Sequence, residues 1–95
     1  MTVEAQISTF PIRVMVTDVW DHVVLAVEPG TRVAEIKRQA LERALRRSGG
    51  GIRLEDYVVK FRGAEVLDES VSVGALGAEA NSPFIVLPAR RRPVR

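Results

Sequence analysis

The stretch that decides the fold reads VVLAVEPGTRVAEIKRQALERA and covers residues 23–44. Its first five residues alternate apolar side chains between two faces, which is the period of a β-strand. Pro29 and Gly30 then end the strand, because proline cannot donate to a ladder and glycine permits a tight turn. Beyond Thr31 the apolar residues recur at steps of three and four, which predicts an amphipathic helix.

Thr31 stands where a helix N-cap belongs, so its hydroxyl is expected to accept the amide hydrogen of Val33 or Ala34. The glycines of residues 49–51 are expected to end the helix. One side of the helix carries bases, which we expect to be exposed: Lys37, Arg38, Arg43, Arg46 and Arg47.

Alternation predicts further strands on both sides of this stretch. Ile12–Val16 and Val23–Val27 are joined by the Asp-rich turn Thr17–Asp21, which predicts an antiparallel hairpin. Strands are also expected at Tyr57–Arg62, after which Gly63 turns the chain, at Glu65–Leu67 and at Phe84–Leu87, and Ser72 is expected to cap a one-turn helix that Gly77 ends. The helix should pack through Val33, Ile36, Ala40 and Ala44 against Val14, Val16, Leu25, Val59, Phe61 and Val86.

The 95 residues leave room for one domain, expected at residues 12–88 between a leader at 1–11 and a basic tail at 89–95. The absence of cysteine excludes disulfides, thiol catalysis and cysteine-bound zinc. The sequence shows neither a signal peptide nor an apolar run that would span a membrane, so the cytoplasm is expected.

Several motifs together resemble ubiquitin. They are Val27-Glu28-Pro29 before the helix, Gly51-Ile52 leading to Phe61-x-Gly63, and Ser72-Val73-x-x-Leu76-Gly77 before the last strand. The resemblance covers about residues 12–90 and implies an α+β fold, the ubiquitin-like β-grasp. In this fold a mixed sheet of four to five strands, in the order 2-1-5-3-4, wraps around one helix.

Ubiquitin-type modifiers and sulfur carriers end in a diglycine, whose carboxylate is adenylated. The residues after Gly77 contain no glycine and close with Arg90-Arg91-Arg92-Pro93-Val94-Arg95. We therefore expect no conjugation through the C-terminus. Several bacterial ubiquitin-like proteins also lack a diglycine, among them small proteins of type VII secretion and accessory subunits of multicomponent oxygenases.

The resemblance also implies a contact surface on the outer face of the sheet. Lys60 stands at the central isoleucine position of ubiquitin's hydrophobic patch, and Ile85 replaces the neighbouring histidine. The outward residues are unusually apolar, which is typical of a contact surface. Scattered surface aliphatics, or a leader folded over this face, remain as other interpretations. The predicted partner-binding residues are Met15, Val58, Lys60, Ile85 and Leu87, and Val24 and Ala26 share their face.

Other candidate sites are weaker. His22 with Asp18 and Asp21 could in principle hold a metal ion, but a solvated turn is favoured and no metal or other cofactor is expected. Trp20 either covers the edge of the sheet or serves as an exposed anchor for a partner. No serine stands among a base and an orienting acid, so nucleophilic catalysis has no set of residues to carry it. No enzymatic activity is expected. Glu65, Asp68 and Glu69 are interpreted as a solvated acidic face.

Basic residues gather in two segments, residues 32–53 with seven bases against two acids, and residues 90–95 with four bases. If they merged, they would form a nucleic-acid footprint, although no aromatic residues are interleaved to stack bases. Nucleic acid is therefore not the favoured partner. The basic patch would consist of Arg43, Arg46, Arg47, Arg53, Arg90, Arg91 and Arg92.

The sequence thus favours a non-catalytic protein-binding module, an adaptor or accessory subunit of a larger assembly. It would meet a protein partner, or a second copy of itself, through the outer sheet face. A carrier that requires C-terminal activation and a nucleic-acid binder are the alternatives, and no membrane contact is expected.

Overall fold

The computed structural model describes residues 9–45 and 53–89. Its elements, in chain order, are β1 (Phe10–Val16), β2 (Asp21–Val27), α1 (Val33–Leu45), a 3-10 turn η2 (Leu54–Asp56), β3 (Tyr57–Phe61), β4 (Ala64–Glu65) and β5 (Ser82–Pro88). The strands form one sheet in the order β2-β1-β5-β3-β4, which confirms the expected order. Within these residues no helix is both long and apolar enough to cross a membrane.

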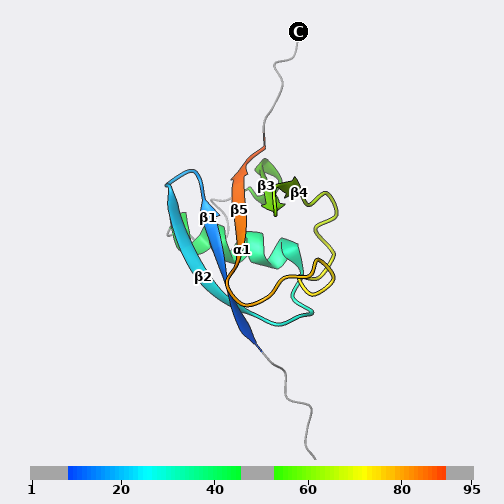
Figure 1. Ribbon diagram of the computed structural model, residues 1–95. Coiled ribbons are helices and arrows are strands. Elements are labelled where there is room, and N and C mark those ends of the chain that lie inside the picture. Colours follow the sequence, from blue (N-terminus) through cyan, green and yellow to red (C-terminus); the bar gives the residue numbers. More distant parts are fainter. Residues whose placement is uncertain (1–8, 46–52, 90–95) are drawn as a thin grey trace, which may run out of the picture.

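The two central strands, β1 and β5, run parallel, while every other neighbouring pair is antiparallel. Figure 1 shows β1 and β5 side by side with α1 crossing them. Because β1 and β5 are parallel, the turn after β1 lies at the same end of the sheet as the end of β5. The amide of Thr17, in that turn, donates to the carbonyl of Val86 at 3.1 Å.

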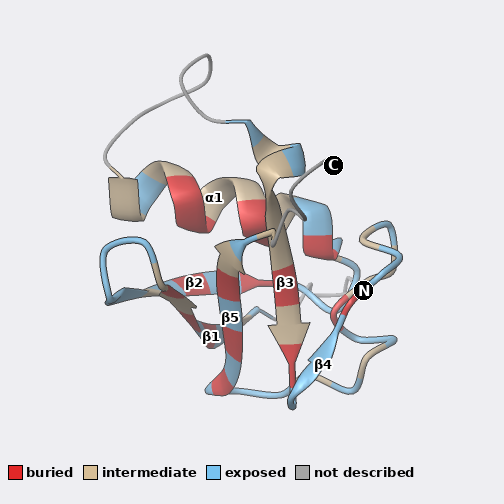
Figure 2. Cartoon of the chain, turned by 90° about the horizontal axis from the view of Figure 1, so that it is seen from above, coloured by how far each residue is buried: buried red, intermediate tan, exposed pale blue. Residues whose placement is uncertain are grey.

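The core lies between α1 and one face of the sheet, and Figure 2 shows the helix along that face. Along each long strand, buried residues alternate with more exposed ones, as the sequence pattern predicted. The expected helix contacts are confirmed, although Ala44 is half-buried at the margin. The core comprises Ile12, Val14, Val16, Leu25, Val27, Val33, Ile36, Ala40, Leu41, Val59, Phe61, Val66, Val73, Phe84 and Val86.

The predicted N-cap of α1 is wrong. The Thr31 hydroxyl accepts a hydrogen bond from the amide of Glu28, at 2.9 Å, and so closes the turn that precedes the helix. The amides of Val33 and Ala34 donate instead to the carbonyls of Val71 and Glu69, at 3.0 and 2.9 Å. The first turn of α1 is therefore capped by backbone from a distant loop, which ties that loop to the helix.

Lys37 is also placed differently from the expectation, because it is buried and not exposed. Its ammonium lies 2.7 Å from a carboxylate oxygen of Glu69 and donates to the carbonyl of Tyr57 at 3.0 Å. Glu69 is thus not part of a solvated acidic face. A buried ammonium needs such partners, since an uncompensated charge in the interior is costly.

The segment between β4 and β5 follows the prediction in part. The Ser72 hydroxyl accepts the amide hydrogen of Ala75, at 3.1 Å, and Gly77 has a positive φ of 84°, as expected of a cap and a stop. The residues between them form turns and are not a helix. β4 is shorter than predicted, because Val66 turns into the core and Leu67 is 85% exposed.

Candidate functional site

The strand register places a row of side chains straight across the outer face of the sheet. Met15 on β1 pairs with His22 on β2 and with Ile85 on β5. Lys60 on β3 pairs with Ile85 on one side and with Glu65 on β4 on the other. Paired residues project from the same face of a sheet. The row His22, Met15, Ile85, Lys60, Glu65 therefore spans all five strands on the face away from α1.

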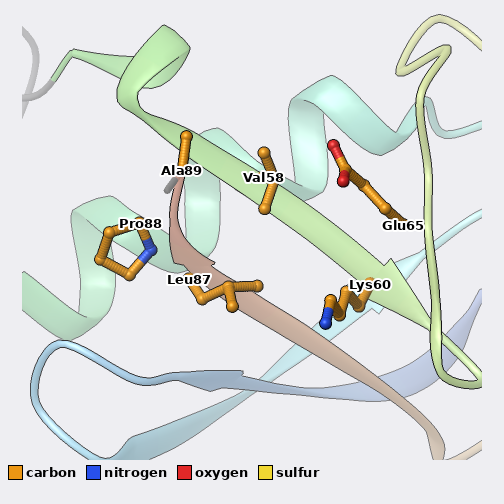
Figure 3. A pocket seen from close by; sticks show the side chains of 6 residues that line it. All are labelled: Val58, Lys60, Glu65, Leu87, Pro88 and Ala89. Carbon is orange, nitrogen blue, oxygen red and sulfur yellow. The ribbon is translucent and has the colours of Figure 1, made fainter. Parts of the chain in front are cut away.

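An open depression of about 590 Å³ lies on one side of this row, at the end of β5. Val58 and Leu87, which are paired across β3 and β5, contribute its aliphatic side chains. Figure 3 shows them between Pro88 and Ala89 at one end and Lys60 and Glu65 at the other. The five residues that the sequence singled out for partner contact thus lie on this row or beside it.

A smaller depression of about 340 Å³ lies on the other side of the row and includes Arg13, Met15, Pro83 and Ile85 in its lining. Further apolar surface continues on β2, where Val24 is 52% exposed, and Ile85 at the centre of the sheet is 39% exposed. The outer face therefore exposes aliphatic side chains from β2 to β3.

The two cations of this face, Arg13 and Lys60, have no ion-pair partner among residues 9–45 and 53–89. In Figure 3 the ammonium of Lys60 points away from the carboxylate of Glu65, its register partner. Arg13 is exposed on β1, next to Pro83. By contrast, Lys37, Arg38 and Arg53 all meet carboxylates.

Arg13 is the site residue that sequence reasoning missed. It shares the parity of Met15, so the alternation of β1 alone placed it on the outer face. Its position beside Pro83 depends on the register of β1 against β5, which cannot be read from the sequence.

The turn between β1 and β2 adds an exposed aromatic residue at the same end as the larger depression. Asp18 in this turn accepts a hydrogen bond from the hydroxyl of Tyr57, at 2.5 Å, which ties the turn to the start of β3. Trp20 is 78% exposed, so the interpretation that it covers the sheet edge is wrong. Its backbone has a φ of 51°, a left-handed conformation that residues other than glycine, asparagine and aspartate rarely adopt.

One of the two edge strands of the sheet, β2, has two of its backbone groups occupied by side chains. A guanidinium nitrogen of Arg43 donates to the carbonyl of Val24 at 3.1 Å. The amide of His22 donates to a carboxylate oxygen of Asp21 at 2.9 Å. Because unpaired edge groups invite another strand, these contacts oppose pairing at this edge.

The predicted basic patch is seen only in part. Arg43 is engaged with the backbone of β2, and Arg53 forms ion pairs with Glu55 and Asp56 at 3.3 and 3.6 Å. Its remaining members lie outside the described residues: Arg46, Arg47, Arg90, Arg91 and Arg92. Nothing in the described part of the chain therefore brings two clusters of bases together.

The acidic groups offer no assembled site in the part of the chain that the structure describes, where no three His, Asp or Glu side chains are arranged to hold a metal ion. Arg38 and Gln39 donate to Glu35 on the surface of α1, and these hydrogen bonds hold the pKa of that carboxyl below its ordinary value of 4.5. Asp68 accepts from the hydroxyl and amide of Ser70, which lowers its pKa in the same way.

Comparisons with known proteins agree with this architecture. No protein-family model matches the chain, and no curated protein is similar enough in sequence to count as a relative. Ubiquitin of Caldiarchaeum subterraneum superposes with a TM-score of 0.70 at 10% identity, over 88% of this chain and 98% of that one. The ubiquitin-like domain of an Arabidopsis thaliana protein, solved in solution by NMR, gives 0.69 at 12% identity, over 97% and 89%. With α1 packed on a five-stranded mixed sheet, the chain has the ubiquitin-like β-grasp fold.

Proposed function

We propose that this protein is a non-catalytic protein-binding module that docks a partner on the outer face of its sheet. One observation carries the proposal: the face that α1 leaves uncovered has an aliphatic centre, with two flanking depressions and charged residues around it. The aliphatic side chains of this centre are those of Met15, Val58, Ile85 and Leu87. Exposed apolar patches of this kind typically mark interaction sites. A ubiquitin-like fold supports a binding role in general terms alone, because a fold by itself does not determine a specific function.

The face is better suited to docking than the β2 edge of the sheet. Arg43 and Asp21 occupy backbone groups of β2, so an added strand would first have to displace them. The outer face requires no such displacement. Taking a fully exposed aliphatic side chain out of water contributes about 1.5–3 kcal/mol before the costs of association. Ile85 is 39% exposed, so its burial contributes a part of this amount. A few such side chains support a moderate affinity, which suits an adaptor or accessory subunit of a larger assembly.

A double substitution tests this proposal. Ile85→Asp with Leu87→Asp places two carboxylates on the face, and Leu67→Asp, on a loop residue that is 85% exposed, serves as the matched control. Proteins retained by the wild type from its source cells are identified, purified and titrated against each variant by calorimetry. We expect the double variant to lose binding and the control to keep it, with circular dichroism unchanged in both. A partner that binds the double variant as tightly as the wild type would disprove the proposal.

Action without covalent attachment is the second part of the proposal. The residues directly after β5 include Arg90-Arg91-Arg92-Pro93, which are bulky and carry a proline, where ubiquitin has a flexible tail that ends in diglycine. Incubation with ATP and an activating enzyme from the same cells, followed by mass spectrometry, is expected to yield neither an adenylate nor a thiocarboxylate. Detection of either product would establish the carrier role instead.

A further inference from the structure

We propose that the partner presents an acidic and apolar segment, in which two carboxylates flank an apolar side chain and meet Arg13 and Lys60. This inference rests on the proposed docking face and adds the chemistry of its ligand. Its starting point is that both cations lie on the outer face without an ion-pair partner in residues 9–45 and 53–89.

The register fixes the geometry of the two cations. Arg13 pairs with Pro83 and Lys60 with Ile85, so they flank β5 from opposite sides and are offset by two residues along it. Two strand spacings of about 4.8 Å and two rises of about 3.3 Å separate their Cα atoms by about 12 Å. The side chains of Pro83 and Ile85 lie on the outer face between them.

This spacing describes the ligand. In an extended segment, carboxylates about four residues apart span this distance, and the residue midway between them faces the sheet. In a helix the same distance corresponds to about seven or eight residues. The apolar side chain between the acids would lie over Ile85, in the middle of the row.

Charge also argues against the other occupants of the face. The row and its two depressions hold two cations, Arg13 and Lys60, against the carboxylate of Glu65. A second copy of the chain would bring the same excess of positive charge to this surface, and like charges facing each other are unfavourable. Single-stranded nucleic acid binds on aromatic side chains that stack its bases, and neither depression has an exposed Phe, Tyr or Trp in its lining, since Phe84 is buried. His22 is the exposed ring in the lining of the smaller depression. A carboxylate pair with an apolar residue between its members matches both the cations and the aliphatic surface.

The test uses a displayed library of random short peptides, selected on the wild-type protein. Enriched peptides are synthesised and titrated by calorimetry against the wild type, Arg13→Gln, Lys60→Gln and the double Gln variant. Arg32→Gln, which removes the same charge from an exposed residue at the start of α1, is the matched control. Ile85→Asp with Leu87→Asp reports on the face itself.

We expect enriched peptides to carry two acids at one of the two spacings with an apolar residue between them. Each single Gln variant should weaken binding about tenfold, as the loss of a hydrogen bond between charged groups does, and Arg32→Gln should leave it unchanged. Replacing either peptide acid by its amide should have the same effect as removing the matching cation.

The outcomes separate this inference from the proposed function. Peptides that lose binding to the Asp double variant but not to the Gln variants would leave the docking face standing and overturn its acidic specificity. Peptides that bind the Asp double variant undiminished would overturn both. Failure to enrich acidic peptides, or a dimer in sedimentation experiments that Ile85→Asp with Leu87→Asp dissociates, would likewise overturn the acidic partner.

Discussion

The ammonium of Lys37 and the carboxylate of Glu69 lie 2.7 Å apart and join the middle of α1 to the loop that also caps the start of that helix. The side chain of Lys37 is buried, whereas about a quarter of the Glu69 side chain is exposed. The pair thus holds together segments that are distant in sequence. Its two halves differ in what is left behind when either one is removed.

Glu69→Gln should destabilise the fold more than Lys37→Met. The first variant leaves a buried ammonium with the Tyr57 carbonyl as its remaining partner, which costs about 1–3 kcal/mol. The second keeps the apolar stem and lets the carboxylate of Glu69 turn toward water. Urea unfolding of both singles and the double variant gives the coupling energy. Losses that simply add would show that the pair is not coupled.

Ile36 lies at the centre of the interface between helix and sheet and is fully buried. Ile36→Ala removes methyl groups that the packed surroundings cannot replace, and we expect a loss of about 2–5 kcal/mol in the free energy of unfolding. Leu67→Ala, on an exposed loop residue, is the control and should change stability by no more than about 0.5 kcal/mol. Native-like stability of Ile36→Ala would contradict the observed packing.

Local pattern predicted most of the fold because strands and helix bury alternate or periodic residues. The spacing of Val14 and Val16 along β1, and of Val33 and Ile36 along α1, indicates within a few residues which side of each element is buried. Thr31 and Lys37 were misplaced for one shared reason. The amides of Val33 and Ala34, which Thr31 was expected to cap, and the ammonium of Lys37 all have partners in residues 69–71. These residues lie far along the chain, and no local period in the sequence reveals a carbonyl or carboxylate from such a distant segment.

The outer face was predictable to a similar degree. Parity placed Ile85 and Leu87 outward, and the resemblance to ubiquitin drew attention to Lys60. The place of Arg13 in the candidate site was recognised only from the pairing of β1 with β5. This pairing puts Arg13 diagonally across Ile85 from Lys60. The occupied edge of β2 likewise depended on Arg43 reaching from α1 to Val24.

Removing the side chains that occupy the edge of β2 should promote self-association. Arg43→Ala exposes the carbonyl of Val24, and Asp21→Ala exposes the amide of His22. A strand edge with unpaired groups is a template for pairing with another chain. We expect the double variant to form larger species by analytical ultracentrifugation as its concentration rises. Arg32→Ala, which removes an exposed arginine and leaves both edge contacts in place, should remain like the wild type. An unchanged distribution of species for the double variant would show that these contacts do not protect the edge.

Trp20 has a strained backbone and an exposed side chain. Its replacement by asparagine should therefore maintain or raise the stability of the fold but weaken the binding of a partner. A left-handed conformation costs a residue of this kind about 1–2 kcal/mol, whereas asparagine adopts it more readily. Trp20→Asn should therefore unfold at the same or a higher urea concentration than the wild type. If the exposed ring anchors the partner of the outer face, the same variant should weaken that complex at least tenfold, about 1.4 kcal/mol, as exposed aromatic anchors do.

Val19→Asn provides the matched control for both measurements, because Val19 lies in the same turn, is also exposed and is not among the residues with positive φ. It should neither gain stability nor lose affinity to the same extent. A clear loss of stability in Trp20→Asn would mean that the ring contributes packing that its 78% exposure does not suggest. Unchanged affinity would remove Trp20 from the contact surface and confine that surface to the sheet, where Ile85 and Leu87 would then supply the aliphatic contacts.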